Sequence, residues 1–357
     1  LPSEAPAMRL LSVSLHGQGP LAGLSLRFGD AEGAPRPLIV LFGGDGTGKT
    51  SVLSAIAHTR PGYALPLLPR PRPRLEGEDA SPGFAVAEWL LGDDDPERPH
   101  TLRVTSPNAK LDEPDDVTLM ARREQAFFDK QAQEGRGFLC VVLSGARWFS
   151  RTSVMLTTPE RSILRYDVRA NASFDDATRA DLTRETKQVL SYASIASALE
   201  RNEEGPFASL DRALREVCGI VLRPFGMQYR DADPATLEPV FVAGARSVLF
   251  DDLPKGARHL VTIVVHAVRA LYNALDGDGD PRVREALVLV DDAESQLDPV
   301  VQRLMPQLLR EALPRVQWVL ATSSPALTLG CLPGEVVALR READRIAVHE
   351  GTDAVIH

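Results

Sequence analysis

The sequence predicts an α/β fold built around a mostly parallel sheet. The first observation is that helical and strand patterns alternate in the last third of the chain. The segments are a helix at 256–275, a strand at 286–290, a helix at 299–313, a strand at 317–321, and closing strands at 336–339 and 345–348. Such alternation is typical of parallel strands joined by crossover helices. The second observation is a glycine-rich stretch between an apolar strand at 38–42 and a helical pattern at 51–57.

This glycine-rich stretch fits the pattern G-x-x-x-x-G-K-[ST] in a strand–loop–helix context. It consists of Gly43, Gly44, Asp45, Gly46, Thr47, Gly48, Lys49 and Thr50, and Ser51 follows. The glycines let backbone N–H groups turn toward a phosphate, and the helix that follows points its positive end at the same place. Lys49 would reach the β- and γ-phosphates, while the Thr50 hydroxyl would bind Mg²⁺. A plain turn with a surface lysine is the alternative, but all three fixed positions and both flanking elements match the phosphate-loop pattern.

Composition indicates a globular chain with no membrane segment. Hydrophobic residues make up 44% of its 357 residues. The longest apolar runs, such as 138–142 and 260–265, are much shorter than the roughly 20 residues that cross a bilayer. Residues 1–7 contain Pro, Ser and Glu and do not resemble a secretory signal, although they need not be native. We therefore expect a cytoplasmic protein.

Charge and cysteine content exclude further classes. The formal net charge of −9 does not favour a protein coated by nucleic acid, which needs a local excess of Lys and Arg. Cys140, Cys218 and Cys331 are odd in number and far apart, so we expect buried free thiols rather than a disulfide framework or a zinc site.

The N-terminal part is predicted to begin with a β-hairpin at 8–28, turning at Gly17, Gly19 and Pro20. A strict period of two would place Leu10, Ser12 and Ser14 on one face. Further elements are predicted after a proline-rich irregular stretch at 61–83, whose alternating Pro and Arg at 69–74 form a solvated loop or a polyproline ligand. They are strands at 84–91 and 101–105 around an acidic turn at 93–96, a helix at 116–133 and a buried strand at 138–143.

The middle of the chain, 148–245, differs from both ends because arginines and carboxylates are mixed throughout it. This pattern usually marks solvated helical faces. Helices are predicted at 175–200 and 206–218. We interpret 148–245 as an inserted, mainly helical lobe.

A second group of candidate site residues follows the strand at 286–290. This strand delivers Asp291 and Asp292 at its carboxyl end, where parallel sheets place their ligands. Asp291 is positioned to hold Mg²⁺ directly or through water.

At this point the sequence resembles a known family. Residues 291–299, which include Glu294, resemble the extended Walker B and D-loop string D-E-P-x-S-x-L-D-P of ABC-type ATPases. Residues 253–258, with Gly256, resemble a degenerate ABC signature, and residues 321–325 resemble the T-H-S-P switch. The hairpin before Gly43 and the string 143–147 resemble the soluble SMC-like and RecF-like branch, whose members are also described as AAA-type ATP-binding proteins. The resemblance covers 8–338, with 61–135 and 148–245 as additions.

The resemblance implies a P-loop NTPase of the ABC head type, with N-terminal antiparallel strands, a mostly parallel core sheet and an inserted helical lobe. Its core would comprise 1–147, with the phosphate loop and an insertion at 61–135, and 246–357, with the signature, Walker B, D-loop and switch. The implied cofactors are ATP and Mg²⁺. Two copies would pair through ATP, with Gly256 touching the nucleotide bound by the opposite copy. The lobe at 148–245 would contact a protein effector, in bacterial antiviral defence or DNA maintenance.

Three departures from the family pattern predict slow hydrolysis. Asp292 replaces the catalytic Glu, Ser323 replaces the His that senses the γ-phosphate, and Pro254 replaces the signature Ser. A displacement of about 1 Å in such a site can cost roughly 10²-fold in rate. Glu294 or a partner residue could supply what is missing. One alternative is an ATP-sensing scaffold that holds a partner without hydrolysis, and another is DNA binding through the arginines of 161–187, which the acidic balance does not favour.

Overall fold

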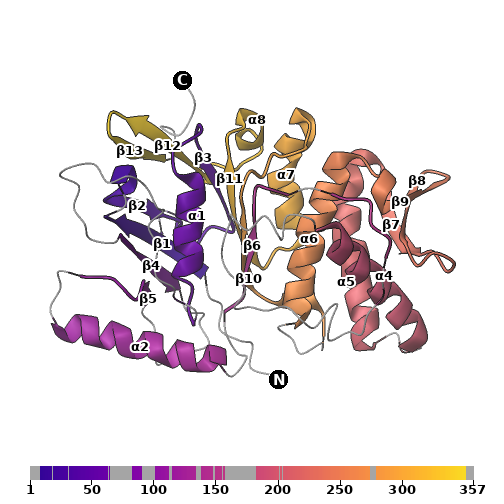
Figure 1. Cartoon of the computed structure of the whole chain (residues 1–357), viewed down its shortest axis with the longest axis horizontal. Helices are drawn as coiled ribbons and strands as arrows, with labels where there is room; N and C mark the ends of the chain where they lie inside the picture. Colours follow the sequence, from indigo (N-terminus) through magenta and orange to yellow (C-terminus); the bar gives the residue numbers. More distant parts are fainter. Residues whose placement is uncertain are drawn as a thin grey trace. The chain divides into compact units, whose positions relative to one another are not determined.

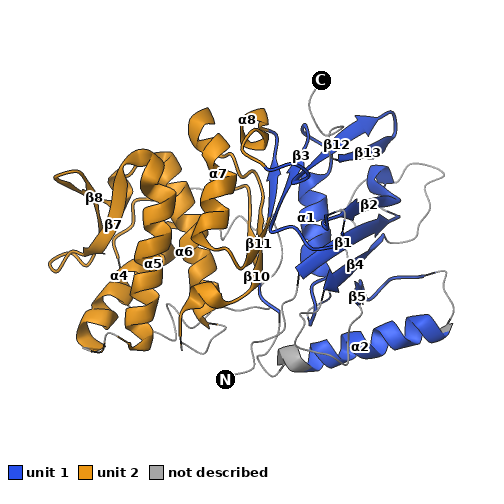
Figure 2. Cartoon of the chain, turned by 180° about the vertical axis from the view of Figure 1, so that it is seen from behind, with its two compact units in different colours: residues 1–140, 319–323, 332–357 blue, residues 141–318, 324–331 orange. Residues whose placement is uncertain are grey.

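The computed structural model describes residues 9–17, 19–30, 32–62, 64, 83–90, 101–111, 115–133, 138–147, 149–154, 156, 182–200, 202, 204–273 and 279–350. The stretches 1–7, 69–74 and 93–96 lie outside these residues, as do most of the arginines of 161–187. Contacts divide the chain into two compact units (Figure 2). Unit 1 comprises Leu1–Cys140, Val319–Ser323 and Leu332–His357, and unit 2 comprises Val141–Trp318 and Ser324–Cys331.

Unit 1 contains a four-stranded antiparallel sheet with the order β2-β1-β4-β5 (Figure 1). Its strands are β1 (Arg9–His16), β2 (Leu24–Arg27), β4 (Phe84–Leu90) and β5 (Leu102–Thr105). The predicted hairpin and both later strands are therefore confirmed. Helix α1 (Lys49–His58) contacts β1 and β4, and α2 (Asp115–Gln133), also predicted, contacts β5.

The predicted alternation along β1 is wrong at one position. Leu10 is fully buried together with Val13 and Leu15, whereas Ser12 and Ser14 lie on the open face. The pairing of β1 with β4 shifts register between Leu10 and Ser12. Because a bulge inserts one extra residue, it reverses which face the following side chains occupy.

A second set of strands in unit 1 carries the phosphate-loop region. The order is β13 (Arg345–Glu350), β12 (Val336–Glu342), β3 (Leu38–Phe42) and the last residues of β11 (Val316–Thr322). β3 pairs in parallel with β12, and β12 pairs antiparallel with β13. The first four residues of β3 are buried, as its uninterrupted apolar sequence predicts. These pairings agree with a mixed, mostly parallel sheet.

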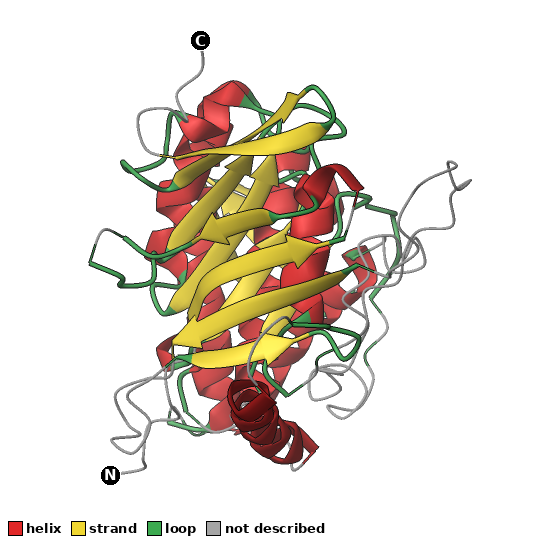
Figure 3. Ribbon diagram, turned by 90° about the vertical axis from the view of Figure 1, so that its left-hand side faces the viewer, coloured by secondary structure: helices red, strands yellow, loops and turns green. Residues whose placement is uncertain are grey.

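Unit 2 contains the start of β11 followed by β10 and β6. Figure 3 colours the helices and strands of the chain by type. The predicted elements of unit 2 are confirmed with small differences at their ends. They are β6 (Cys140–Leu143), α6 (Lys255–Asn273), β10 (Ala286–Val290) and α7 (Pro299–Ala312). The short helix α8 (Pro325–Thr328) was not predicted. All five residues of β10 are buried, so this strand runs through the interior.

The rest of unit 2 combines helices with strands that the sequence pattern did not reveal. Helices α4 (Thr183–Glu200) and α5 (Pro206–Leu222) pack on each other, and both contact α6. A three-stranded antiparallel sheet follows, in the order β7-β8-β9. Its strands are β7 (Met227–Ala232), β8 (Pro239–Ala243) and β9 (Arg246–Leu249). The described part of 182–249 is thus helical only in its first half.

Short 3-10 turns complete the description, at Gly19–Leu21, Arg223–Phe225, Phe250–Asp252 and Pro281–Val283. Among the described residues, no helix is both long enough and apolar enough to cross a bilayer. All three cysteines are free thiols. Cys140 and Cys218 are buried as expected, but Cys331 is partly exposed.

Candidate functional site

The phosphate-loop residues 43–50 connect β3 to α1 within unit 1. Gly48 is the N-cap of α1 and has a left-handed backbone with φ 86°, which glycine adopts without steric cost. A Cβ at Gly43 would lie 2.6 Å from the carbonyl oxygen of Leu339, and one at Gly48 would lie 2.7 Å from Leu21 Cδ2. At Gly44 a Cβ would meet nothing within 4 Å. Backbone closeness and conformation therefore require glycine at Gly43 and Gly48, while Gly44 borders open space.

Lys49 occupies the first turn of α1, and its side chain is only 8% exposed. Its ammonium donates hydrogen bonds to the carbonyl oxygens of Gly43, at 2.7 Å, and Gly44, at 3.0 Å. Because an ammonium carries three N–H donors, one more remains for an oxygen outside the loop. The buried charge is thus held over the loop by the loop's own backbone.

The other loop residues stabilise the same backbone or face solvent. The Thr47 hydroxyl donates to the Gly44 carbonyl at 2.8 Å, and Arg341 Nη2 donates to the Gly46 carbonyl at 3.1 Å. Asp45 is exposed, and Thr50 and Ser51 are half-buried on the first turn of α1.

The N-terminus of α1 can bind an anion through its backbone N–H groups. The first N–H groups of a helix have no acceptor within the helix, and no side chain caps α1 through its N-cap residue. These donors and the helix dipole favour a negative group. Gly43 and Gly48 keep the loop backbone close to its neighbours, where a Cβ would not fit. These glycines, the helix N–H donors and the buried Lys49 together form a cradle that fits a nucleotide phosphate.

Ser323 lies in the same unit, immediately after β11. The preceding carbonyl, that of Thr322, accepts a hydrogen bond from the Gly43 N–H at 3.2 Å. Ser323 itself is exposed. The end of β11 therefore lies beside the start of the phosphate loop.

The acidic candidates lie in unit 2, directly after β10. Asp291 is 5% exposed, and its N–H donates to the Leu143 carbonyl at 2.9 Å. Asp292 is exposed and has a positive φ of 43°, which is uncommon for a residue other than glycine. Glu294 is half-buried two residues later. β10 thus presents these carboxylates at its carboxyl end, as predicted.

Gly256 lies in the first turn of α6 and is buried. A Cβ at this position would lie 3.1 Å from Leu297 Cδ2 and 3.2 Å from the Gln296 carbonyl oxygen. Glycine therefore lets α6 approach the loop that follows β10. The structure thus gives Gly256 a packing role, whereas its contact with a nucleotide stays a prediction.

Magnesium would obtain few ligands from the protein. Within the described ranges, no group of three or more His, Cys, Asp or Glu side chains could hold a metal ion. Mg²⁺ usually keeps several waters and binds one or two protein oxygens together with substrate phosphates. Thr50 in unit 1 and Asp291 in unit 2 each offer an oxygen of the type that a nucleotide-borne Mg²⁺ uses.

Two residues near the carboxylates were not predicted as site residues. The Arg147 guanidinium donates to the carbonyls of Asp291, at 2.8 Å, and Asp292, at 3.0 Å. His259 on α6 contacts the Ala293 carbonyl through Nε2 at 3.2 Å, and burial lowers its pKa to about 3, helped by the nearby Arg147 charge. His259 is therefore neutral at physiological pH. An arginine four residues beyond a buried strand is the signal that could have indicated the first of these contacts.

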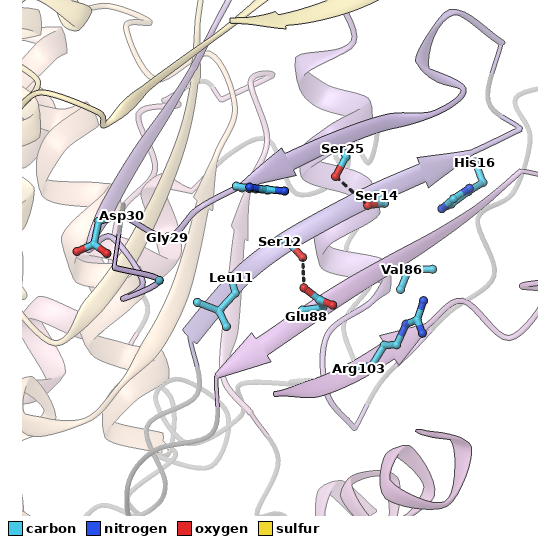
Figure 4. A pocket seen from close by; sticks show the side chains of 12 residues that line it. Leu11, Ser12, Ser14, His16, Ser25, Gly29, Asp30, Val86, Glu88 and Arg103 are labelled. Atoms are coloured by element: carbon cyan, nitrogen blue, oxygen red, sulfur yellow. Dashed lines mark hydrogen bonds between the residues drawn. The ribbon is translucent and has the colours of Figure 1, made fainter. Parts of the chain in front are cut away.

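A separate shallow cavity of about 630 Å³ lies on the open face of the β2-β1-β4-β5 sheet (Figure 4). Strand register places Arg27, Ser12, Glu88 and Arg103 in one row across the four strands. Ser12 donates to Glu88 at 2.8 Å, so this row is internally hydrogen-bonded. Such cross-strand pairs are usual on the solvent face of an antiparallel sheet.

Comparison with known proteins gives limited similarity. No protein-family model matches the chain. A stretch of 111 residues, 30% of this chain, is 24% identical to the Septu protein PtuA of Bacillus thuringiensis. The match spans only 28% of that protein's length.

Solved structures similar to this chain include three SMC heads. The SMC head domain from Thermotoga maritima is 12% identical, with a TM-score of 0.43 over 96% of this chain and 98% of that one. The SmcHead bound to the C-winged helix domain of ScpA is also 12% identical, with a TM-score of 0.44 over 96% and 97%. The Smc head with an extended coiled coil, bound to the C-terminal domain of ScpA and derived from Pyrococcus furiosus, is 11% identical, with a TM-score of 0.44 over 96% of each chain.

Proposed function

We propose that the chain binds ATP with Mg²⁺ at residues 43–51, pairs with a second copy through the bound nucleotide, and hydrolyses it slowly. The observation that carries this proposal is the phosphate loop, where an uncapped helix start, obligatory glycines and a buried Lys49 converge. No other described feature combines these properties. The motif order along the chain supports an ABC-type arrangement, in which each nucleotide is shared between two copies.

Each site residue has a distinct role in this proposal. Lys49 binds the β- and γ-phosphates, while Thr50 and Asp291 hold Mg²⁺, which neutralises the charge that develops on the phosphates. Asp292, or Glu294 in its place, orients the attacking water. Ser323 contacts the γ-phosphate, and Gly256 touches the nucleotide of the opposite copy.

The proposed biological context follows from the same motifs. The core parts 1–147 and 246–357 would form the nucleotide-dependent head, and 148–245 would contact a protein effector. Regulation of such an effector by the ATP-bound dimer suits bacterial antiviral defence or DNA maintenance. A non-hydrolysing ATP sensor is the second candidate, since Asp292 and Ser323 both depart from the residues that speed hydrolysis.

Nucleotide binding is tested by replacing the loop lysine. Charge-assisted hydrogen bonds contribute roughly 1.5–3 kcal/mol. We therefore expect Lys49→Ala to weaken binding of a fluorescent ATP analogue by about 10- to 100-fold. Lys110→Ala is the matched control, because Lys110 is an exposed lysine of the same unit. Equal affinity in the Lys49 variant and the wild type would rule out the assignment.

Hydrolysis and pairing are measured on the same proteins. Light scattering should show ATP-dependent dimers for the wild type but not for Lys49→Ala. Phosphate release should be slow for the wild type and faster for Asp292→Glu, which restores the longer carboxylate. ATP-dependent dimers without any phosphate release would instead favour the ATP-sensing scaffold.

A further inference from the structure

Arg147 connects the ends of two neighbouring strands of unit 2. It lies in the turn after β6, and its side chain is only 6% exposed. Its Nη1 donates to the carbonyls of Leu143, at 3.3 Å, Ser144 and Asp291, at 2.8 Å. Its Nη2 donates to the Asp292 carbonyl at 3.0 Å. One side chain therefore fixes the backbone at both strand ends.

This arrangement depends on the chemistry of arginine. A guanidinium is planar and presents five N–H donors in a fixed geometry, whereas an ammonium offers a compact charge on a flexible stem. Burial lowers the pKa of Arg147 to about 10, and the charges of Asp291, Asp292 and Glu294 oppose that shift. The group is therefore a cation at neutral pH, close to three carboxylates.

The backbone held by Arg147 is unusual at Asp292. Its φ of 43° lies in the left-handed region, which is sterically unfavourable for a residue other than glycine. The hydrogen bond from Arg147 to the Asp292 carbonyl stabilises this conformation. Without the guanidinium, the Asp292 backbone would shift to a more favourable conformation, and the direction of its carboxylate would change.

Gly145 makes room for the same carboxylate. A Cβ at Gly145 would lie 2.4 Å from Asp292 Oδ2 and 3.0 Å from its Cγ. The Asp292 side chain therefore rests against the turn after β6. Arg147 sets the backbone of Asp292, and Gly145 admits its side chain.

The loop after β10 is held at two further points. Gln296 Nε2 donates to the Arg147 carbonyl at 3.3 Å, and His259 contacts the Ala293 carbonyl. Gln296 also has a positive φ, of 64°. The turn after β6 and the loop after β10 are thus joined by hydrogen bonds.

We propose that Arg147 is a positioning residue that directs the carboxylates of Asp291 and Asp292 toward the nucleotide-bound Mg²⁺ and the attacking water. This inference rests on the proposed function, since it assigns a role within the same site. Arg147 touches neither nucleotide nor metal in this role. It acts through the backbone of the two aspartates.

The test compares Arg147→Lys and Arg147→Met with the wild type. We measure affinity for a fluorescent ATP analogue in EDTA, its dependence on Mg²⁺ concentration, ATP turnover and the melting temperature. Because a displacement of about 1 Å can cost roughly 10²-fold, we expect Arg147→Met to lose about 10- to 100-fold in turnover. The Mg²⁺ concentration for half-maximal effect should rise about tenfold on the same grounds, while affinity in EDTA stays within about twofold. Arg147→Lys should show an intermediate loss.

A purely structural role gives a different result. The variants would then melt at lower temperature, but the folded protein would keep its wild-type Mg²⁺ dependence and turnover, which would overturn the inference. Gly145→Ala provides a second route if Arg147→Met does not fold, because it displaces the Asp292 carboxylate and leaves Arg147 in place. It should raise the Mg²⁺ requirement in the same direction. Gly219→Ala is its control, since a Cβ there meets nothing within 4 Å.

The outcomes separate this inference from the proposed function. Failure of the wild type to bind the ATP analogue would refute the proposed function and this inference with it. Normal binding and Mg²⁺ dependence in the wild type, with no change in Arg147→Lys and Gly145→Ala, would refute the role of Arg147 alone.

Discussion

At the scale of single residues, two adjacent glycines of the phosphate loop have different physical reasons to be glycine. A Cβ on Gly43 would press against a backbone oxygen, that of Leu339, which cannot move without shifting β12. A Cβ on Gly44 would project into open space. The sequence motif does not distinguish Gly43 from Gly44. In the structure, only Gly43 lies where a Cβ would clash with neighbouring atoms.

This contrast gives a stability prediction. Gly43→Ala should destabilise the protein by about 1–3 kcal/mol, the usual cost of forcing an extra methyl group into a packed site. Gly44→Ala should change stability by less than about 0.5 kcal/mol. Thermal melting in the absence of nucleotide measures both. Equal melting temperatures for the two variants would contradict the packing role of Gly43.

The sequence reveals residues whose chemistry is local and misses those whose partners are distant. Residues 43–51 could be predicted as a phosphate loop because strand, loop and helix are contiguous and the motif fixes their spacing. Arg147 was not assigned a role, since its acceptors at Asp291 and Asp292 lie 144 and 145 positions away. No sequence pattern shows which backbone carbonyls an arginine will contact, because only folding of the sheet brings them close to it.

At the scale of elements, a buried lysine joins α4 to the strands that follow it. Lys187 is 1% exposed and donates to Asp251 Oδ2 at 2.6 Å and to the Thr152 carbonyl at 2.8 Å. Its ammonium also lies 3.0 Å from Glu238 Oε2. The second Glu238 oxygen accepts from the Val154 N–H at 3.0 Å. One cation thus holds α4, the segment 149–154, the start of β8 and the turn before α6.

Removing this cation should destabilise the protein strongly. Lys187→Met leaves two partly buried carboxylates without their counter-charge, and breaking a buried ion pair costs about 3–5 kcal/mol. Arg184→Met is the matched control, because Arg184 is exposed on the same helix. Chemical denaturation should show a large loss for Lys187→Met and a change within about 0.5 kcal/mol for the control. A similar small change in both variants would mean that Lys187 contributes no net stability.

Among the elements, α6 and β10 were predicted from the sequence, whereas β9 was missed. α6 and β10 have strong patterns because nearly every residue faces the interior. β9 has no buried residue, so its four residues show no alternation that a sequence pattern could detect. The bulge in β1 is invisible for another reason, since it reflects pairing with β4 rather than any property of Leu10 or Leu11.

At the scale of the whole molecule, the free energy of unfolding at acidic pH depends on a histidine that is buried in its neutral form, His266. His266 on α6 is 6% exposed, and burial lowers its pKa to about 4. Glu185, whose Oε2 lies 4.0 Å away, opposes the shift, and Arg269, which binds the same carboxylate at 2.8 Å, adds to it. The Thr186 and Thr262 hydroxyls complete the polar surroundings.

The sign of the pH effect follows from proton binding. Above pH 6.5 the histidine is neutral in both folded and unfolded chains, so it adds no pH dependence. Between pH 6.5 and about 4 the unfolded chain binds the proton and the folded chain does not, so stability falls as the pH falls. One such group accounts for about 1–3 kcal/mol.

This effect is measured as unfolding free energy against pH for the wild type and His266→Gln. Because glutamine does not titrate, the variant should lose less stability between pH 6.5 and 4. Carboxylates contribute equally to both curves, so the difference isolates His266. Parallel curves would show that His266 is protonated in the folded protein too.

The pairing of β3 with β12 has a consequence for how the protein is made. β3 ends at Phe42, yet its parallel partner begins only at Val336, and Arg341 contacts Gly46 across 295 positions. During translation β3 has no neighbour on this side until β12 has been synthesised. A product that stops before β12 therefore lacks both this strand and the Arg341 contact to the phosphate loop.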